Sequence, residues 1–234
     1  MRPSSVLRVG VVGCGNVALR RHLPVLQSLR QAEAVALADT SPERLERAGA
    51  QFGVDRRYRD YRALLADCAV DAIAVCTPPQ THVEIALAAL EADKHTLIEK
   101  PLALSLDGCD ALIRRADESS CKVMVGFNMR WHRLVKEARA MIDSNQLGPL
   151  VAMRYVATSQ YRDREQAWLE RRGLGGGMLI EFAVHVFDLW RFMLRSEVVE
   201  VYANSRTGRW EDETATITAR MASGVLTTAL LSKG

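Results

Sequence analysis

The chain has 234 residues, of which 48% are hydrophobic and 25% charged, a balance typical of a globular protein with a sizeable core. Its formal charge of +3 is small, and its 31 basic and 28 acidic residues are well mixed, which argues against nucleic acid or an anionic membrane as a partner. The five cysteines show no C-x-x-C spacing, and no apolar run reaches membrane-spanning length. We therefore expect free thiols, no metal site and, since no signal-peptide cleavage pattern follows Met1, a cytoplasmic location.

The first element is an apolar, β-branched run over residues 7–12, which predicts a buried strand that stops at a glycine. The turn that follows reads Gly13-Cys14-Gly15-Asn16-Val17-Ala18, and a helical pattern begins directly after it. In a dinucleotide-binding turn, Gly13 would permit the tight bend, Gly15 would let a pyrophosphate approach the backbone, and Ala18 would let the helix pack closely on the strand. The turn therefore predicts a cofactor site.

The phosphates of such a cofactor would bind N–H groups at the start of the helix, at Asn16 and Val17. A second strand, predicted over residues 34–38, ends at Asp39, 21 residues after Ala18, close to the spacing of the acid that hydrogen-bonds the adenosine ribose. Asp39 either binds that ribose or caps the next helix, for which Ser41 is the better candidate. A carboxylate there would repel a 2′-phosphate, so NAD is favoured over NADP.

Strands and helices then alternate through the first half of the chain. We predict further strands over residues 57–58, 71–76, 96–98 and 122–126, and helices over residues 17–29, 43–52, 61–66, 81–92 and 106–118. This rhythm predicts an α/β fold, a doubly wound parallel sheet of the Rossmann type. Ligands of such sheets bind at the carboxyl ends of the strands.

Two of these strand ends carry polar motifs, Thr77-Pro78-Pro79-Gln80-Thr81-His82 and Glu99-Lys100-Pro101. His82 either faces a cofactor or is a structural histidine of the first helical turn. Lys100 lies at the end of a central strand, between an acid and a proline, and is either a functional residue or a solvated turn lysine.

With Gly13-x-Gly15-x-x-Ala18, Asp39 and these two motifs in order, the sequence resembles the Gfo/Idh/MocA oxidoreductases, the relatives of glucose–fructose oxidoreductase and inositol dehydrogenase. The resemblance covers essentially the whole chain. It implies that Lys100 hydrogen-bonds the substrate hydroxyl or carbonyl beside the nicotinamide. It also implies that Thr77, Pro78, His82 and Glu99 belong to the cofactor site.

A change of pattern near residue 126 predicts two domains, residues 1–126 for dinucleotide binding and residues 127–234 for substrate binding and oligomerisation. After a helix that continues to about residue 145, we predict a strand over residues 150–158. The charged segment 161–172 is expected to be irregular or a short exposed helix, with solvated arginines rather than a site for an acidic substrate. The resemblance places Asn128 and Arg130 among residues that line a substrate cleft.

A helix predicted over residues 178–194 carries Glu181 and His185 at i, i+4, with Asp188 near the same face. A carboxylate–imidazole pair suits proton transfer, although such a pair on a helix is more often structural. The segment resembles the family element Gly-Gly-Gly-x-Leu-x-Asp-x-Gly-x-His-x-x-Asp, with Glu181 in place of the aspartate and Ala183 in place of the later glycine. The resemblance implies that His185 and Glu181 are catalytic and that Asp188 binds substrate.

The last predicted elements are strands over residues 198–205, 214–221 and 225–231, which give an α+β domain with a mostly antiparallel sheet. The domain is short beside the family pattern, which indicates either a truncated form or a short variant whose sheet is completed in another way. An open sheet edge is a liability unless another chain covers it, so we expect a homo-oligomer through this sheet.

The sequence thus predicts an NAD-dependent oxidoreductase that transfers a hydride between nicotinamide and a carbinol carbon of a sugar, cyclitol or related polyol. Two alternatives stay open: a glycosidase that uses NAD for a transient oxidation, and a non-catalytic dinucleotide-binding regulator.

Overall fold

The computed structural model describes residues 6–159 and 167–233. The chain divides into two compact units, Met1–Gly126 and Phe127–Gly234. The first unit contains β1 (Leu7–Val12), α1 (Leu23–Ser28), β2 (Ala32–Ala38), α2 (Pro42–Phe52), β3 (Arg56–Tyr58), α3 (Tyr61–Leu65), β4 (Ala72–Val75), α4 (His82–Glu91), β5 (His95–Ile98), α5 (Leu106–Asp117) and β6 (Val123–Val125). The second contains α6 (Arg133–Asp143), β7 (Ala152–Thr158), α7 (Ala183–Leu194), β8 (Val198–Arg206), β9 (Thr214–Met221) and β10 (Leu226–Ser232).

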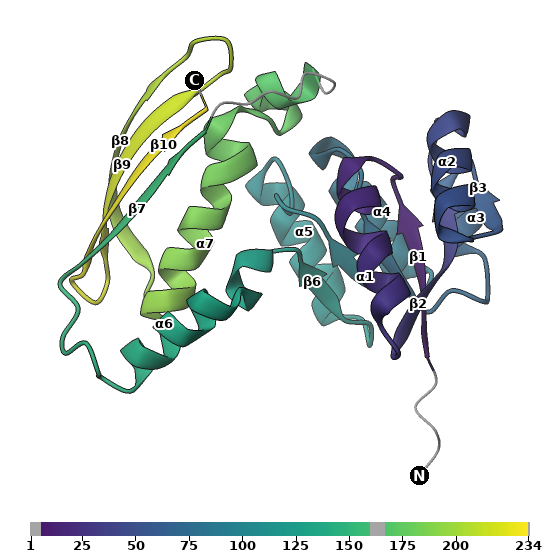
Figure 1. Cartoon of the computed structure of the whole chain (residues 1–234), viewed down its shortest axis with the longest axis horizontal. Coiled ribbons are helices and arrows are strands. Elements are labelled where there is room, and N and C mark those ends of the chain that lie inside the picture. The colour runs from purple at the N-terminus through teal and green to yellow at the C-terminus, as the bar shows by residue number, and fades with distance from the viewer. Residues whose placement is uncertain (1–5, 160–166, 234) are drawn as a thin grey trace. The chain divides into compact units, whose positions relative to one another are not determined.

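The first unit is a six-stranded parallel sheet in the order β3-β2-β1-β4-β5-β6 (Figure 1). From β1 the chain builds outward to β3, then returns to the other side of β1 with β4. The order of the strands therefore reverses between β1 and β4, which is where such sheets bind ligands. The expected doubly wound Rossmann fold is confirmed.

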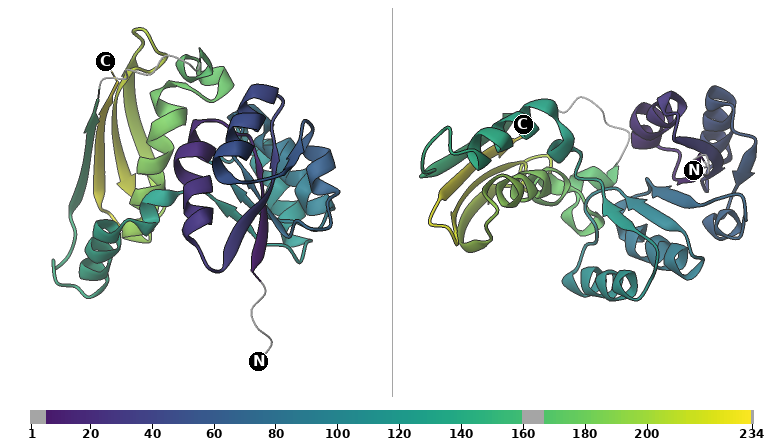
Figure 2. Two further views of the ribbon diagram at one scale, coloured as in Figure 1. Left: turned by 45° about the vertical axis from the view of Figure 1, so that its right-hand side comes forward. Right: turned by 90° about the horizontal axis from the view of Figure 1, so that it is seen from below.

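Helices cover both faces of this sheet, as Figure 2 shows. Along β1 the buried side chains alternate: Val9 and Val11 pack into the cluster with Leu23 of α1 and Leu45 of α2, whereas Val12 packs into the cluster on the opposite face with α3, α4 and α5. The central strands β1 and β4 are largely buried, so their sequences are nearly continuous apolar runs, whereas the edge strand β3 is Arg-Arg-Tyr and partly exposed.

The predicted helix over residues 17–29 is present, and it is irregular next to Pro24, as the proline in the sequence indicates. Its middle is a π-turn, Ala18–His22 (η1), in which the N–H of Leu23 donates to the carbonyl of Ala18, five residues earlier. Pro24 accounts for this, because its ring has no N–H and would collide with the carbonyl of Arg20 in a regular α-helix. The wider turn moves the side chains of this segment away from simple helical spacing.

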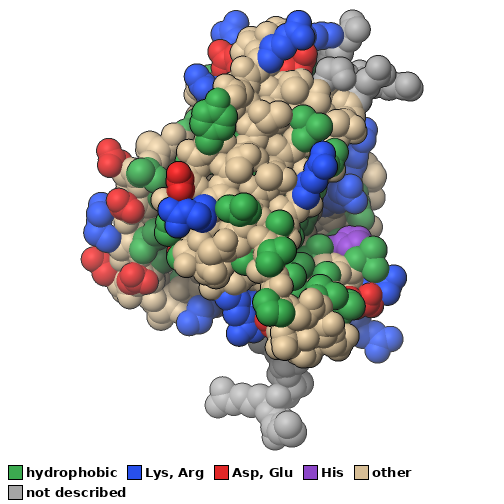
Figure 3. Space-filling view, turned by 90° about the vertical axis from the view of Figure 1, so that its left-hand side faces the viewer, with side chains coloured by type: hydrophobic (Ala, Val, Ile, Leu, Met, Phe, Trp, Pro, Cys, Tyr) green, Lys and Arg blue, Asp and Glu red, His purple; other side chains and the backbone are tan. Residues whose placement is uncertain are grey.

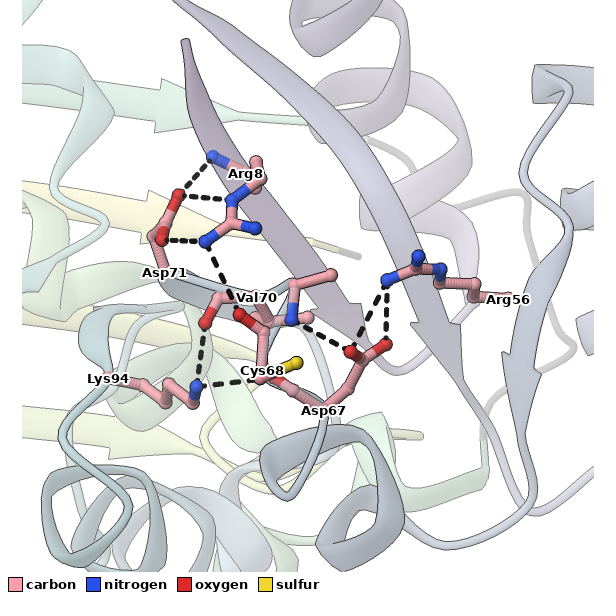
Figure 4. Close-up of polar contacts among 8 residues, drawn as sticks. Arg8, Arg56, Asp67, Cys68, Val70, Asp71 and Lys94 are labelled. Carbon is pink, nitrogen blue, oxygen red and sulfur yellow. Dashed lines mark hydrogen bonds and ion pairs between the residues drawn. The ribbon is translucent and has the colours of Figure 1, made fainter. Parts of the chain in front are cut away.

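At the amino-terminal edge of the sheet, a loop over residues 67–71 is tied to β1 and β5 by charged groups (Figure 4). The guanidinium of Arg8 donates to both carboxylate oxygens of Asp71, at 2.9 and 2.6 Å. Lys94 donates to the carbonyls of Val70 at 2.7 Å and Asp67 at 3.3 Å, and Arg56 pairs with the Asp67 carboxylate. These contacts lie at the edge opposite the carboxyl ends of the strands, so their role is structural.

The second unit is a four-stranded sheet in the order β7-β10-β9-β8. β10 is parallel to β7 and antiparallel to β9, and β8 is antiparallel to β9, so the sheet is mixed and mostly antiparallel, as expected. The helix α7 covers one face (Figure 1), where Trp190 and Val186 pack with Ile217, Met221 and Leu231. The other face is exposed and carries threonines together with separate apolar side chains such as Val156 and Tyr202 (Figure 3).

The predicted helix over residues 178–194 also begins with a π-turn, Met178–Phe182 (η6), and becomes α-helical only from Ala183. Ahead of it, Ala167–Glu170 (η4) and Arg172–Leu174 (η5) are short 3₁₀ turns, while residues 161–166 of the predicted charged segment lie outside the described residues. Of the helices in the described ranges, none has the length and apolar character that a membrane crossing requires.

Candidate functional site

The glycine turn after β1 has the geometry that the sequence predicts. Gly13 has a φ of +93°, and a Cβ there would lie 2.7 Å from the carbonyl carbon and oxygen of Cys76. Only glycine fits, because both the backbone conformation and the close approach of β4 exclude a side chain. A Cβ on Gly15, in contrast, would meet no atom within 4 Å. Packing does not demand glycine at 15, but its absent side chain leaves the backbone open to a ligand.

Asp39, at the end of β2, holds this turn. Its carboxylate accepts the N–H of Cys14 at 2.7 Å through one oxygen and the N–H of Ser41 at 2.8 Å through the other. The cap of α2 is Ser41, whose hydroxyl accepts the N–H of Arg44, so Asp39 is not the helix cap. Each carboxylate oxygen has a further lone pair, so Asp39 can anchor the turn and still accept hydrogen bonds from a ribose.

His82, at the start of α4, contacts two neighbouring loops. It is buried, with Nδ1 2.7 Å from the carbonyl oxygen of Pro101 and Nε2 2.9 Å from that of Thr77. Burial lowers the pKa of His82 below its usual value and outweighs the hydrogen bonds to the two carbonyls, which act to raise it. Both ring nitrogens face backbone carbonyls, which favours the structural alternative, and the assignment of His82 to the cofactor site stays a prediction. His82 joins the loop after β4, with half-buried Thr77 and exposed Pro78, to the loop after β5.

The Glu99-Lys100-Pro101 segment follows β5, and both Glu99 and Lys100 are half-buried. One carboxylate oxygen of Glu99 lies 2.7 Å from His22 Nε2, and the other accepts the N–H of Lys100 at 3.3 Å. Burial alone would raise the pKa of Glu99, but the hydrogen bond and charge of His22, with the charge of Lys100, bring that pKa below its usual value. The sequence analysis missed His22, because helical spacing does not indicate where a π-turn aims a side chain.

In the second unit, His185 is buried on α7 between two aromatic rings. The ring centroids of Phe127 and Phe182 lie 6.2 and 6.1 Å from that of His185, both in edge-on arrangements. Glu181 forms an ion pair with Lys233, just after β10, and its catalytic role stays a prediction. The ammonium group of Lys233 also lies 5.2 Å from the centre of the Trp210 ring. Lys233 is a second residue that the sequence analysis missed.

Arg130 and Asp188, both expected to bind substrate, bind each other. Arg130 Nε donates to one Asp188 oxygen at 2.8 Å, and a terminal guanidinium nitrogen donates to the other. Asp188 is buried and its carboxylate is bonded to Arg130, while its role as a substrate ligand stays a prediction. Asn128, in the same 3₁₀ turn as Arg130, is exposed. Among the residues described, no cluster of three or more His, Cys, Asp or Glu side chains could hold a metal ion.

These features agree with the family models that the chain matches. Residues 7–127 match the GFO/IDH/MocA oxidoreductase family model with an NAD-binding Rossmann fold, and residues 135–233 match the GFO/IDH/MocA C-terminal domain. The chain belongs to this family.

Similar proteins include dehydrogenases. A myo-inositol 2-dehydrogenase of Thermotoga maritima is 30% identical over 227 residues, which cover 94% of this chain and 66% of that enzyme. A crystal structure of a probable dehydrogenase from Thermotoga maritima superposes with a TM-score of 0.89 at 28% identity, covering 97% of this chain and 69% of that one. An oxidoreductase from Agrobacterium radiobacter, solved in complex with NAD⁺, L-tartaric acid and magnesium, has a TM-score of 0.90 at 26% identity, covering 98% of this chain and 67% of that one.

The chain is short beside its curated relatives. It spans 66% of the Thermotoga maritima enzyme and 55% of an oxidoreductase of Bacillus subtilis to which it is 27% identical.

Proposed function

We propose that this protein is an NAD-dependent oxidoreductase that transfers a hydride between nicotinamide and a carbinol carbon of a sugar, cyclitol or related polyol. The observation that carries the proposal is the glycine turn, where Gly13 is required by the fold, Gly15 is open, and the Asp39 carboxylate is held against the turn. Inositol dehydrogenases are among the similar proteins, which supports the substrate class.

The first unit has the features that NAD requires. The open backbone at Gly15 suits a pyrophosphate beside the helix N-terminus, and the lone pairs of Asp39 suit a ribose diol while repelling a 2′-phosphate. We assign the first unit to dinucleotide binding and the second to substrate binding. When bound, NAD supplies the carbon that accepts or donates the hydride.

The chain's own residues would manage the oxygen and its proton. The ammonium group of Lys100 would donate a hydrogen bond to the substrate oxygen and stabilise the negative charge that develops on it. His185 would accept the hydroxyl proton during oxidation and return it during reduction. The Lys233 ion pair neutralises Glu181, so we assign Glu181 a role in shaping the site rather than in carrying the proton.

The experiment is a screen for NADH absorbance with inositols and sugars, with Lys100→Met and His185→Gln as matched variants. We expect turnover in the wild-type protein and a large loss in both variants, with NAD affinity retained in His185→Gln. Wild-type turnover in both variants would contradict the assigned roles.

The same assay separates the two alternatives. Hydrolysis of aryl glycosides that needs NAD but yields no net NADH would indicate a glycosidase. NAD binding without turnover on any sugar, cyclitol or glycoside would indicate a regulator, which the neutralised Glu181 would suit.

We also propose a homo-oligomer through the outer face of the β7–β10 sheet. This face carries exposed apolar side chains on separate strands, among them Val156, Tyr202 and Leu226 (Figure 3).

A further inference from the structure

We propose that His22 and Glu99 form a positioning pair that holds the backbone of Lys100 and links it to the helix after the glycine turn. The importance of Lys100 rests on the proposed function, whereas the pair itself is a property of the first unit.

Glu99 contacts both partners at once. One carboxylate oxygen is 2.7 Å from His22 Nε2, and the other accepts the N–H of Lys100 at 3.3 Å. The side chains of Glu99 and His22 are only 18% and 16% exposed, so water competes weakly for this contact. The backbone N–H of Glu99 is bonded to the carbonyl of Val75 in β4, which fixes the base of the side chain.

The other side of Lys100 is also held. His82 Nδ1 lies 2.7 Å from the carbonyl oxygen of Pro101, and Nε2 lies 2.9 Å from that of Thr77. Lys100 therefore lies between one residue fixed by His22 and another fixed by His82. Its backbone has little freedom, while its own side chain is only half-buried. This arrangement suits a residue whose ammonium group must meet a substrate oxygen in one position.

The position of His22 follows from Pro24. Because Pro24 has no N–H and its ring conflicts with the carbonyl of Arg20, the turn Ala18–His22 widens into a π-turn closed by the Leu23 N–H. One extra residue in a turn rotates the following side chains by about 100°. In a regular helix the side chain of His22 would face a different direction. Pro24 therefore helps to place His22 beside Glu99.

The groups that interact with Glu99 suit its negative charge. Glu99 faces His22 and Lys100, and the thiol of Cys76 and the imidazole of His82 also feel its charge. The thiol of Cys76 is buried, and burial raises its pKa well above the usual value, with the charge of Glu99 acting in the same direction. An ionised Glu99 therefore has neutral Cys76 and cationic or donor groups around it.

The test compares His22→Ala and Glu99→Gln with the conservative His22→Gln, whose side-chain amide places an N–H donor near the position of Nε2. Arg21→Ala is the matched control, since Arg21 is exposed in the same π-turn. On a substrate found in the screen, we expect His22→Ala to lower kcat by roughly 10- to 100-fold, as misplacement of a catalytic group by about 1 Å does, with little change in the KM for NAD. His22→Gln should restore most of that turnover. Equal kcat in His22→Ala and Arg21→Ala, or His22→Gln as impaired as His22→Ala, would overturn the proposal.

A second measurement needs no turnover: the hydrogen-exchange rate of the Lys100 amide, from NMR of the ¹⁵N-labelled full chain. We expect faster exchange in His22→Ala and Glu99→Gln, and also in Pro24→Ala, which removes the cause of the π-turn. Exchange in Arg21→Ala should match the wild type. Unchanged exchange in His22→Ala refutes the pair whatever the enzyme does, whereas a wild-type chain with no activity but the expected exchange pattern refutes only the proposed function.

Discussion

Inside the second unit, the guanidinium of Arg130 donates two hydrogen bonds to the carboxylate of Asp188, one of them 2.8 Å long. The Asp188 side chain is 4% exposed and that of Arg130 is 40% exposed, so the carboxylate depends on the guanidinium far more than the reverse. Two aromatic rings, Phe127 and Phe192, lie about the guanidinium, at 5.6 and 5.4 Å from its central carbon. The pair connects the 3₁₀ turn Asn128–Trp131 (η3) to α7, the helix that carries His185.

Removing Arg130 should therefore destabilise the protein strongly. Arg130→Ala leaves a buried carboxylate without its counter-charge, a loss of about 3 kcal/mol or somewhat less because the guanidinium is partly exposed. Arg133→Ala, which breaks an exposed pair with Glu137, is the control and should cost no more than about 0.5 kcal/mol. The measurement is urea unfolding followed by circular dichroism. Equal midpoints for the two variants would show that the pair is not structural.

The Arg8–Asp71 pair predicts a pH dependence. The hydrogen bond from Arg8 lowers the pKa of Asp71 from 3.8 to about 2 in the folded protein. A folded-state pKa below the unfolded value means that the stabilisation is complete above about pH 4 and is lost as the pH falls toward 2. The difference in unfolding midpoint between the wild type and Asp71→Asn should therefore shrink over that range. Arg8→Ala should show the same trend, and a difference that stays constant with pH would contradict the assignment.

Asp39 predicts the cofactor preference. We expect the wild type to bind NAD much more tightly than NADP. In Asp39→Ser, the loss of charge-assisted hydrogen bonds to the ribose should weaken NAD binding by about 10- to 100-fold. The affinity for NADP should stay the same or rise, because its 2′-phosphate is no longer repelled. The ratio of the NAD affinity to the NADP affinity should therefore fall. Fluorescence titration gives both affinities, and the melting temperature of the variant shows whether loss of the Cys14 contact has disturbed the turn. A ratio unchanged by the substitution would remove Asp39 from the ribose site.

Much of the first unit could be predicted because its signals are local. Each buried strand is a short apolar run, and Gly13, Asp39 and Lys100 follow strand ends directly, so the topology of a parallel sheet brings them to one edge. The π-turns could not be predicted, since apolar periodicity assumes 3.6 residues per turn and does not show where Pro24 widens the helix.

Contacts between residues far apart in the sequence could not be predicted either. Glu99 is 77 residues from His22, and Glu181 is 52 residues from Lys233, and no local spacing relates them. The i, i+4 pattern of Glu181 and His185 is a local signal, whereas no local signal indicates the ion pair of Glu181 with Lys233 or the π-turn Met178–Phe182.

The exposed sheet face predicts the oligomeric state. We expect the wild type to be a dimer or larger by light scattering coupled to size exclusion. A charge at Val156 or Tyr202, as in Val156→Asp or Tyr202→Asp, should dissociate it, because burying an uncompensated charge in an interface is unfavourable. Leu106→Asp is the control, as Leu106 is 82% exposed on the first unit. A monomeric wild type, or dissociation by all three variants alike, would contradict an interface on this face.

The Glu181–Lys233 pair predicts non-additive substitutions. Lys233 is buried with its ammonium group near the Trp210 and Phe182 rings, so Glu181→Gln takes away the carboxylate charge beside a buried cation and should destabilise the protein by about 3 kcal/mol. Lys233→Met should cost a similar amount, because it removes the cation beside the largely buried Glu181 carboxylate. In the double variant no buried charge of the pair remains, and Met can fill the space of the lysine stem. The loss in unfolding free energy of the double variant should therefore be much smaller than the sum of the two single losses. Urea unfolding of the four proteins gives the coupling energy. A coupling near zero would show that the two charges do not depend on each other, and Glu181 would then be free to serve His185 instead.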